Sequence, residues 1–157
     1  MFDRKRMNQV VVCVDEYKKR KKIFHKFRDI CTEILSHENP FDMSTQSIGE
    51  TRLEFVVFDT RVVADFSFKI RAAKDMEELV TIGYIAFKSV LGDTAEEFWE
   101  LYFDKNGHVA KAIGGETYPF NILNTHGVEN FLYYLVYKLI NLDCHKAKEK
   151  RGLFSKG

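Results

Sequence analysis

The segment from Arg61 to Ile70 alternates apolar and polar residues with few exceptions, which is the pattern of a β-strand with one buried and one solvated face. The apolar set is Val62, Ala64, Phe66, Phe68 and Ile70, and the polar set is Arg61, Asp65, Ser67 and Lys69. This alternation favours an antiparallel sheet, because parallel sheets are covered on both faces and read as continuous apolar runs. The chain therefore needs other elements to cover the apolar face of the sheet.

The first such element is a predicted helix between Asp15 and Ser36. Its apolar residues recur at helical spacing and would lie on one side: Ile23, Phe24, Phe27, Ile30, Cys31, Ile34 and Leu35. Asp15 suits the N-cap, where a carboxylate accepts a backbone hydrogen bond and meets the positive end of the helix. The helix is expected to end before Pro40, because proline disfavours helical geometry in the residue that precedes it. The earlier residues Val10–Val14 scatter around a helical wheel, so we predict a short strand there.

Basic residues are concentrated in the same helix, since residues 17–28 contain seven Lys or Arg and no acid, whereas residues 93–104 contain five acids and no base. The net charge is only +1, so electrostatic binding would depend on this local asymmetry. The side chains that could meet phosphates or an acidic partner are Lys18, Lys19, Lys21, Lys22, His25 and Lys26. They could equally form an ordinary solvated helix face. Arg20 differs from them because it falls inside the apolar arc, where it would either snorkel or pair with an acid on the sheet.

Further strands are predicted at 52–58, 97–103, 109–113 and 118–123, with tight turns at 59–60 and 104–107. Residues 37–50 are interpreted as a loop, because this stretch is rich in Asn, Pro, Asp, Ser, Thr and Gly. The segment 79–91 combines a helical stripe with features of a strand. We favour a strand, since Val80–Ile85 is rich in β-forming residues and Gly83 would weaken a helix.

Alternation in the predicted strand 97–103 places Trp99, Leu101 and Phe103 on one face. The same alternation places Glu97 and Glu100 on opposite faces of the strand, so these two acids are not expected to act as a carboxylate pair. Each of them could instead meet a basic group of a partner, and both are therefore candidates for an interface.

A second helix is predicted from about Gly127 to Cys144. Its main apolar stripe consists of Val128, Phe131, Leu132, Leu135, Leu139 and Leu142. A further stripe lies on nearly the opposite side and consists of Tyr133, Tyr137 and Ile140. A helix that is apolar on two sides is either sandwiched in the core or shared with a partner. Because tyrosine is enriched at interfaces, these three residues are interface candidates, and the alternative is that they pack under the sheet.

Together these elements predict an α+β fold, in which an antiparallel β-meander of four to six strands packs with an N-terminal and a C-terminal helix. The length of 157 residues suits a single domain, 1–157, and we expect residues 1–8 and 147–157 to fray. If the meander curls around the last helix, the shape would be helix-grip-like, with an apolar cavity that could hold a small ligand.

Three cysteines at wide spacing, Cys13, Cys31 and Cys144, form no disulfide framework and favour a reducing, cytoplasmic setting. No stretch has the pattern of a secretory signal or of a bilayer-spanning helix. The sequence lacks paired metal-ligand spacing and the GxSxG, HExxH and P-loop motifs. We therefore predict no metal, cofactor or membrane partner, and a non-catalytic regulatory or inhibitory role, in which charged surfaces bind a protein partner or a second copy. The alternatives are a nucleic-acid-associated protein that uses the basic helix and a small-ligand-binding domain.

Overall fold

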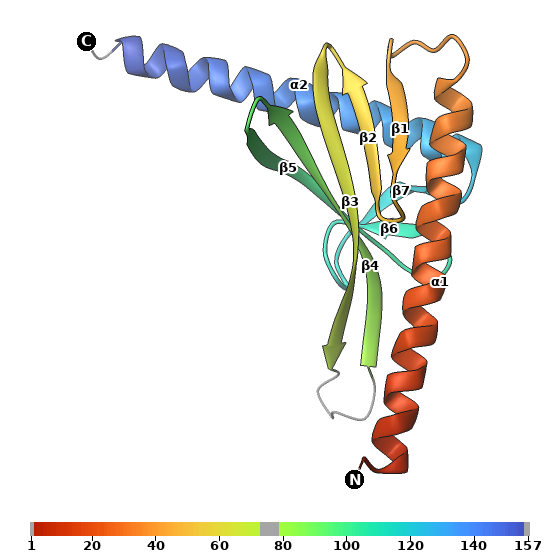
Figure 1. Ribbon diagram of the computed structural model, residues 1–157. Coiled ribbons are helices and arrows are strands. Elements are labelled where there is room, and N and C mark those ends of the chain that lie inside the picture. Colours follow the sequence, from red (N-terminus) through yellow and green to blue (C-terminus); the bar gives the residue numbers. More distant parts are fainter. Residues whose placement is uncertain (1, 73–78, 156–157) are drawn as a thin grey trace.

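The computed structural model describes residues 2–72 and 79–155, and it shows an antiparallel sheet with a long helix before it and another after it (Figure 1). The elements in chain order are α1 (Arg4–Leu35), β1 (Ser44–Ile48), β2 (Arg52–Val57), β3 (Thr60–Ala72), β4 (Leu79–Leu91), β5 (Thr94–Phe103), β6 (His108–Ala110), β7 (Thr117–Asn121) and α2 (Thr125–Ser155). The sheet has seven strands, and they lie side by side in chain order. The predicted α+β meander with two terminal helices is therefore confirmed, with seven strands in place of four to six.

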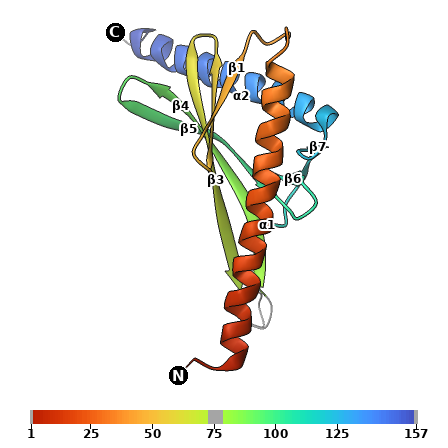
Figure 2. The ribbon, with the colours of Figure 1, turned by 45° about the vertical axis from the view of Figure 1, so that its right-hand side comes forward.

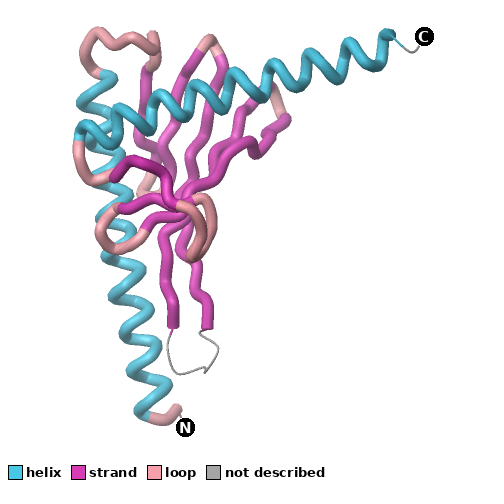
Figure 3. Tube along the Cα trace, turned by 180° about the vertical axis from the view of Figure 1, so that it is seen from behind, coloured by secondary structure: helices cyan, strands magenta, loops and turns pink. Residues whose placement is uncertain are grey.

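Both helices pack against the same face of the sheet, and Phe131 of α2 lies at the centre of the core between them. Figures 2 and 3 show α1 running beside the sheet and α2 crossing its strands. The Phe131 ring centroid lies 4.9 Å from that of Phe27 in α1 and 5.6 Å from that of Phe87 in β4. Its distance to the Trp99 ring of β5 is also 5.6 Å. Aromatic rings thus fill the space where a helix-grip arrangement would offer a ligand cavity.

Helix α1 begins much earlier than predicted, with Asp3 in place of Asp15 as its N-cap. The Asp3 carboxylate accepts a hydrogen bond from the backbone N–H of Arg6 at 2.8 Å. The predicted strand at Val10–Val14 is therefore wrong, and Asp15 lies within the helix. Valine is less favourable than alanine in a helix by only about 0.5 kcal/mol. A helix that is already nucleated and capped continues through such residues at small cost.

The predicted loop 37–50 contains a strand, because β1 pairs antiparallel with β2. The side chains of β1 are mostly exposed, so the segment carries no alternating apolar pattern that could reveal it. The turn between β2 and β3 consists of Phe58 and Asp59, one residue earlier than predicted. Residues 79–91 form β4, which confirms the preference for a strand.

Gly83 of β4 lies directly opposite Phe103 of β5. A Cβ atom on Gly83 would lie 2.2 Å from the Phe103 ring, closer than two such atoms can approach. Glycine therefore lets this buried ring lie against the backbone of β4. Gly83, which would weaken a helix, is therefore required by the packing of Phe103 against β4.

The second helix exceeds its predicted range 127–144 at both ends, so α1 and α2 both extend into the terminal segments that we expected to fray. Asn124 caps α2, since its Oδ1 accepts a hydrogen bond from the backbone N–H of Gly127 at 2.7 Å. A Cβ on Gly127 would lie 1.8 Å from the carbonyl oxygen of Asn121, so glycine allows β7 to approach the start of the helix. In the part of the chain that the structure describes, no helix is both long and apolar enough to span a bilayer.

Candidate functional site

Three adjoining hollows surround the loop 37–43, which leads from α1 to β1. The first has a volume of about 470 Å³ and lies between the end of α1 and the start of α2. The second, of about 320 Å³, follows α2 towards the β2–β3 turn, and the third, of about 590 Å³, lies between that turn and the loop. We call the whole region the acidic–aromatic surface, and it consists of residues 37–42, Glu33, Phe58, Asp59, Glu129, Tyr133, Tyr137 and Ile140.

The centre of the acidic–aromatic surface is apolar and exposed. Phe58 and Tyr133 are each 59% exposed, Tyr137 is 60% exposed and Ile140 is 43% exposed. The rings of Tyr133 and Phe41 pack edge to face with centroids 4.7 Å apart. The three predicted interface candidates of α2 therefore do not pack under the sheet, and they lie together with two phenylalanines that sequence analysis did not single out. Large exposed apolar side chains in one cluster are typical of a binding surface.

The loop that carries Phe41 is held in shape by Asn39. Its Oδ1 accepts hydrogen bonds from the backbone N–H groups of Phe41 at 3.1 Å and of Met43 at 3.3 Å. Its Nδ2 donates to the carbonyl oxygens of His37 at 3.2 Å and of Met43 at 3.3 Å. Met43 is buried and anchors the loop to the core. These hydrogen bonds and this anchor hold the loop in one conformation in the isolated chain.

Unfavourable backbone conformations are concentrated at the same surface. Among the described residues, the non-glycine residues with positive φ are Asp42, Phe58 and Asp59, at 47°, 51° and 59°, and all three line the third hollow. The left-handed conformation costs about 1–2 kcal/mol for an ordinary side chain. Asp tolerates this conformation, whereas Phe does not. Two-residue turns usually contain Asn, Asp or Gly. The phenylalanine in this turn is therefore the sequence signal that could have indicated the site.

Acidic residues border the apolar centre. They are Glu33, Glu38, Asp42, Asp59 and Glu129. Among the described residues that line the three hollows, His37 is the only ionisable base. The surface is therefore negative at neutral pH, and it would attract cationic groups and disfavour polyanions.

The predicted basic face of α1 is partly engaged within the chain. Lys19 pairs with Asp15 at 3.0 Å, and Lys21 pairs with Glu50 in the turn after β1. His25 Nε2 lies 2.8 Å from the carbonyl oxygen of Glu50. The hydrogen bond from the Lys21 ammonium group lowers the pKa of the Glu50 carboxyl below its ordinary value. The lysines among these candidates that have no ion-pair partner in the described residues are Lys18, Lys22 and Lys26.

Arg20 is only 4% exposed, so it does not snorkel, and no acid of the sheet pairs with it among the described residues. One of its terminal nitrogens donates to Glu16 of the same helix at 3.0 Å. The other donates to the carbonyl oxygen of Thr81 in β4 at 3.3 Å. Both predictions for this side chain are therefore wrong. Arg20 joins α1 to β4 and contributes nothing to the exposed basic face.

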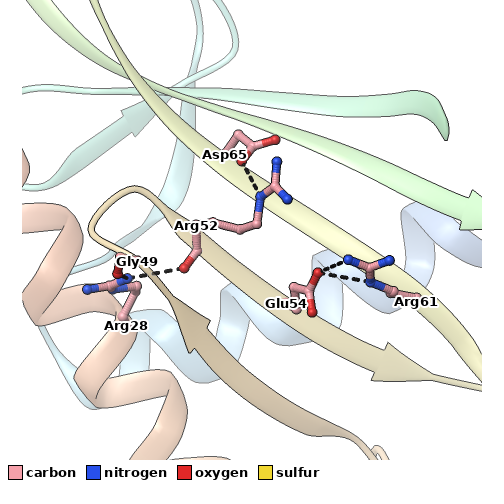
Figure 4. Close-up of polar contacts among 6 residues, drawn as sticks. All are labelled: Arg28, Gly49, Arg52, Glu54, Arg61 and Asp65. Carbon is pink, nitrogen blue, oxygen red and sulfur yellow. Dashed lines mark hydrogen bonds and ion pairs between the residues drawn. The ribbon is translucent and has the colours of Figure 1, made fainter.

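Arginine side chains also hold the first hairpin to α1 and occupy the other face of the sheet (Figure 4). Arg28 of α1 donates to the carbonyl oxygens of Gly49 at 2.8 Å and of Arg52 at 3.1 Å. This contact sets the position of the β1–β2 hairpin relative to the helix. Cross-strand ion pairs on the solvated face include Arg52–Asp65 and Arg61–Glu54. Each pair combines opposite charges, so the pairs add no net charge to this face.

Glu97 and Glu100 lie on the same face of β5, and the prediction that they lie on opposite faces is wrong. A β-bulge shifts the register between Phe87↔Trp99 and Lys88↔Glu97, which inserts one extra residue into β5. The Tyr84 hydroxyl lies within hydrogen-bonding distance of both carboxylates, 2.7 Å from Glu100 and 3.1 Å from Glu97. Burial of Tyr84, with these two hydrogen bonds, raises the pKa of its phenol well above the ordinary value. The phenol is therefore protonated at neutral pH, and its single proton can be donated to either of the two carboxylates.

No protein-family model matches this chain, and comparisons with curated proteins and with solved structures also find no significant match. Within the residues that the structure describes, no group of three His, Cys, Asp or Glu side chains is placed to hold a metal ion.

Proposed function

We propose that this chain is a non-catalytic protein-binding module, and that its acidic–aromatic surface accepts a partner segment with a large apolar side chain flanked by Lys or Arg. One observation carries the proposal: an exposed aromatic cluster, an acidic border and a left-handed phenylalanine coincide on one surface. Exposed aromatic rings lower solubility, and backbone strain lowers the stability of the fold. Their coincidence on one surface therefore favours a binding role. We place this regulatory or inhibitory role in the cytoplasm, because free Cys13 and Cys31 suit a reducing compartment.

The chemistry of the surface selects the partner segment. A large apolar side chain can enter the hollow that Phe41, Phe58 and Tyr137 line, where it loses its contact with water. Lysine or arginine beside it can reach the acids of the border and lie over the exposed tyrosine rings. The loop held by Asn39 needs no rearrangement to make these contacts, so little ordering entropy is lost.

A selection of random phage-displayed peptides on the immobilised chain tests the proposal. We expect the retained peptides to share a large apolar residue close to Lys or Arg. Their affinity for Tyr137→Ala should be lower by at least about tenfold, because truncating a central aromatic of an interface removes a large share of the binding energy. Leu91→Ala is the control, since Leu91 is 81% exposed and lies outside the acidic–aromatic surface. Peptides without the expected pattern, or equal affinity for Tyr137→Ala, would count against the proposal.

Three lysines of the basic face of α1 that have no ion-pair partner among the described residues support a second candidate, the binding of nucleic acid. Lys18, Lys22 and Lys26 follow one another at i, i+4 and i+8, so they form one line along the exposed side of the helix. If each meets one phosphate, the logarithm of the affinity for random oligonucleotides should fall with the logarithm of salt concentration, with a slope of about −2 to −3. Replacing all three by glutamate should abolish retention. An oligonucleotide that is not retained at low salt would end this candidate.

A further inference from the structure

Strands β3 and β4 are longer than the strands beside them. Each has 13 residues, whereas β2 has 6 and β5 has 10. Strand β3 pairs with β2 only as far as Asp65, but it pairs with β4 as far as Ala72. Residues 67–72 of β3 therefore have a strand on one side only. In Figures 1 and 2 no described element lies beside this part of β3 on the side away from β4.

The free side of β3 carries backbone groups that point outward. The backbone N–H of Phe66 donates to the carbonyl oxygen of Thr51 at 2.8 Å, so the groups of Phe66 point towards β2. Along a strand, every second residue directs its N–H and C=O to the same side. The groups of Phe68 and Ile70 therefore point the same way, past the end of β2, where no described residue bonds them. We call residues 67–72 the open edge.

Other edges of the sheet carry features that hinder pairing with a further strand. Strand β1 is only five residues long, and β7 contains Pro119. Strand β5 pairs with β6 only at its end, and it is interrupted by the bulge at Phe98. Where β4 extends beyond β5, Arg20 of α1 donates to the carbonyl oxygen of Thr81 at 3.3 Å. The open edge contains no proline, and its pairing with β4 contains no bulge.

The side chains of the open edge differ between the two faces of the sheet. On the face that α1 covers, Phe68 is half-buried and Ile70 is 53% exposed. On the solvated face, Lys69 and Arg71 are both exposed, and neither has an ion-pair partner among the described residues. The Lys69 ammonium group lies over the ring of Tyr84, 4.2 Å from its centroid. An added strand could therefore bury apolar side chains on one face and place acids beside these bases on the other.

We propose that the open edge binds an extended segment of a partner protein as an additional strand, and that this segment alternates apolar and acidic side chains. Its backbone would bond the outward groups of Phe68 and Ile70, and its alternate side chains would provide specificity. A second copy of this chain fits poorly. Two-fold pairing of two open edges would set Lys69 and Arg71 against the same bases of the other copy. The proposal does not depend on the acidic–aromatic surface, and either can fail without the other.

A short fluorescein-labelled peptide in which valine and glutamate alternate is the probe. Fluorescence anisotropy should show saturable binding, and a peptide with lysine in place of glutamate should bind at least about tenfold more weakly. On binding, hydrogen exchange measured by NMR should slow at the amides of Phe68 and Ile70. The amides of Lys69 and Arg71 point towards β4, so their exchange should change little. No binding, or slower exchange only outside the open edge, would overturn the proposal.

Methylation of the peptide nitrogens tests whether the backbone is recognised. Alternate residues of a strand face its neighbour, so methylation of the valines or of the glutamates should abolish binding, but not both. Equal effects of the two methylated peptides would overturn the proposal. Ile70→Pro removes one outward N–H and leaves the ladder with β4 intact, so it should weaken binding about tenfold. Ile70→Thr keeps the N–H and is the matched control, with an expected change of no more than about twofold.

A charge reversal tests the selection of acidic segments. Arg71→Glu should weaken binding of the glutamate peptide about tenfold and strengthen binding of the lysine peptide. Lys105→Glu makes the same change of charge in the exposed turn after β5, outside the open edge, and should affect neither peptide. Equal effects of the two reversals would contradict a site at the open edge. Sedimentation equilibrium should show no dimer of the unmodified chain that Ile70→Pro dissociates, since such a dimer would place a second copy on the edge and overturn the proposal.

Discussion

Replacing Phe131 by alanine should lower the free energy of unfolding by about 3–5 kcal/mol. Phe131 is fully buried. Its ring packs with rings from α1 and four strands, namely Phe27, Phe55, Phe87, Trp99 and Phe120. Truncation leaves a cavity that all of these elements line, and a packed core relaxes only partly into such a space. Denaturant unfolding can be followed by fluorescence, because Trp99 is the only tryptophan and stacks on Phe131.

Two substitutions on the same helix serve as controls for Phe131→Ala. Phe131→Leu keeps most of the volume and should cost about 1 kcal/mol. Tyr137→Ala removes a ring that is 60% exposed, so the free energy of unfolding should change by no more than about 0.5 kcal/mol. A loss below about 1 kcal/mol for Phe131→Ala would show that this ring is not the centre of the core.

The elements that could be predicted from the sequence are those on which burial imposes a repeat. Strand β3 and the second half of α1 each bury one face, so their periods of two and 3.6 are visible. Strand β1 is mostly exposed and shows no repeat. Val10–Val14 is also exposed, so only weak intrinsic preferences favoured a strand there. The bulge at Phe98 depends on pairing with β4, and a single inserted residue reverses the face on which Glu97 was expected.

Residues of the candidate site could be predicted only where the sequence pattern of a single element identifies them. Tyr133 and Tyr137 were identified because α2 is apolar on two sides. Phe41 and Phe58 come from a loop and a turn distant in sequence, and their proximity to α2 is a consequence of the tertiary fold. The ion pairs of the basic residues of α1 could not be predicted for the same reason. Lys21 contacts Glu50 in a hairpin turn, and the position of this turn depends on the tertiary fold.

Phe58→Asn is expected to change stability and binding in opposite directions. Phe58 has a φ of 51° in a two-residue turn, where asparagine is among the preferred residues. Relief of the left-handed strain should raise the free energy of unfolding by about 0.5–1 kcal/mol. The ring is 59% exposed, so little packing is lost with it. Loss of the ring should weaken the binding of selected peptides at least about tenfold, as measured by fluorescence anisotropy.

Phe58→Ala separates the two effects, because alanine removes the ring but keeps a Cβ that opposes positive φ. It should weaken peptide binding as much as Phe58→Asn does, without the gain in stability. Unchanged binding in both variants would place Phe58 outside the site. Equal stability of Phe58→Asn and the unmodified chain would mean that the turn stores no strain. An exposed ring in an unfavourable backbone conformation lowers stability, and a gain in binding can explain why it is kept. The two variants measure the loss of stability and the gain in affinity separately.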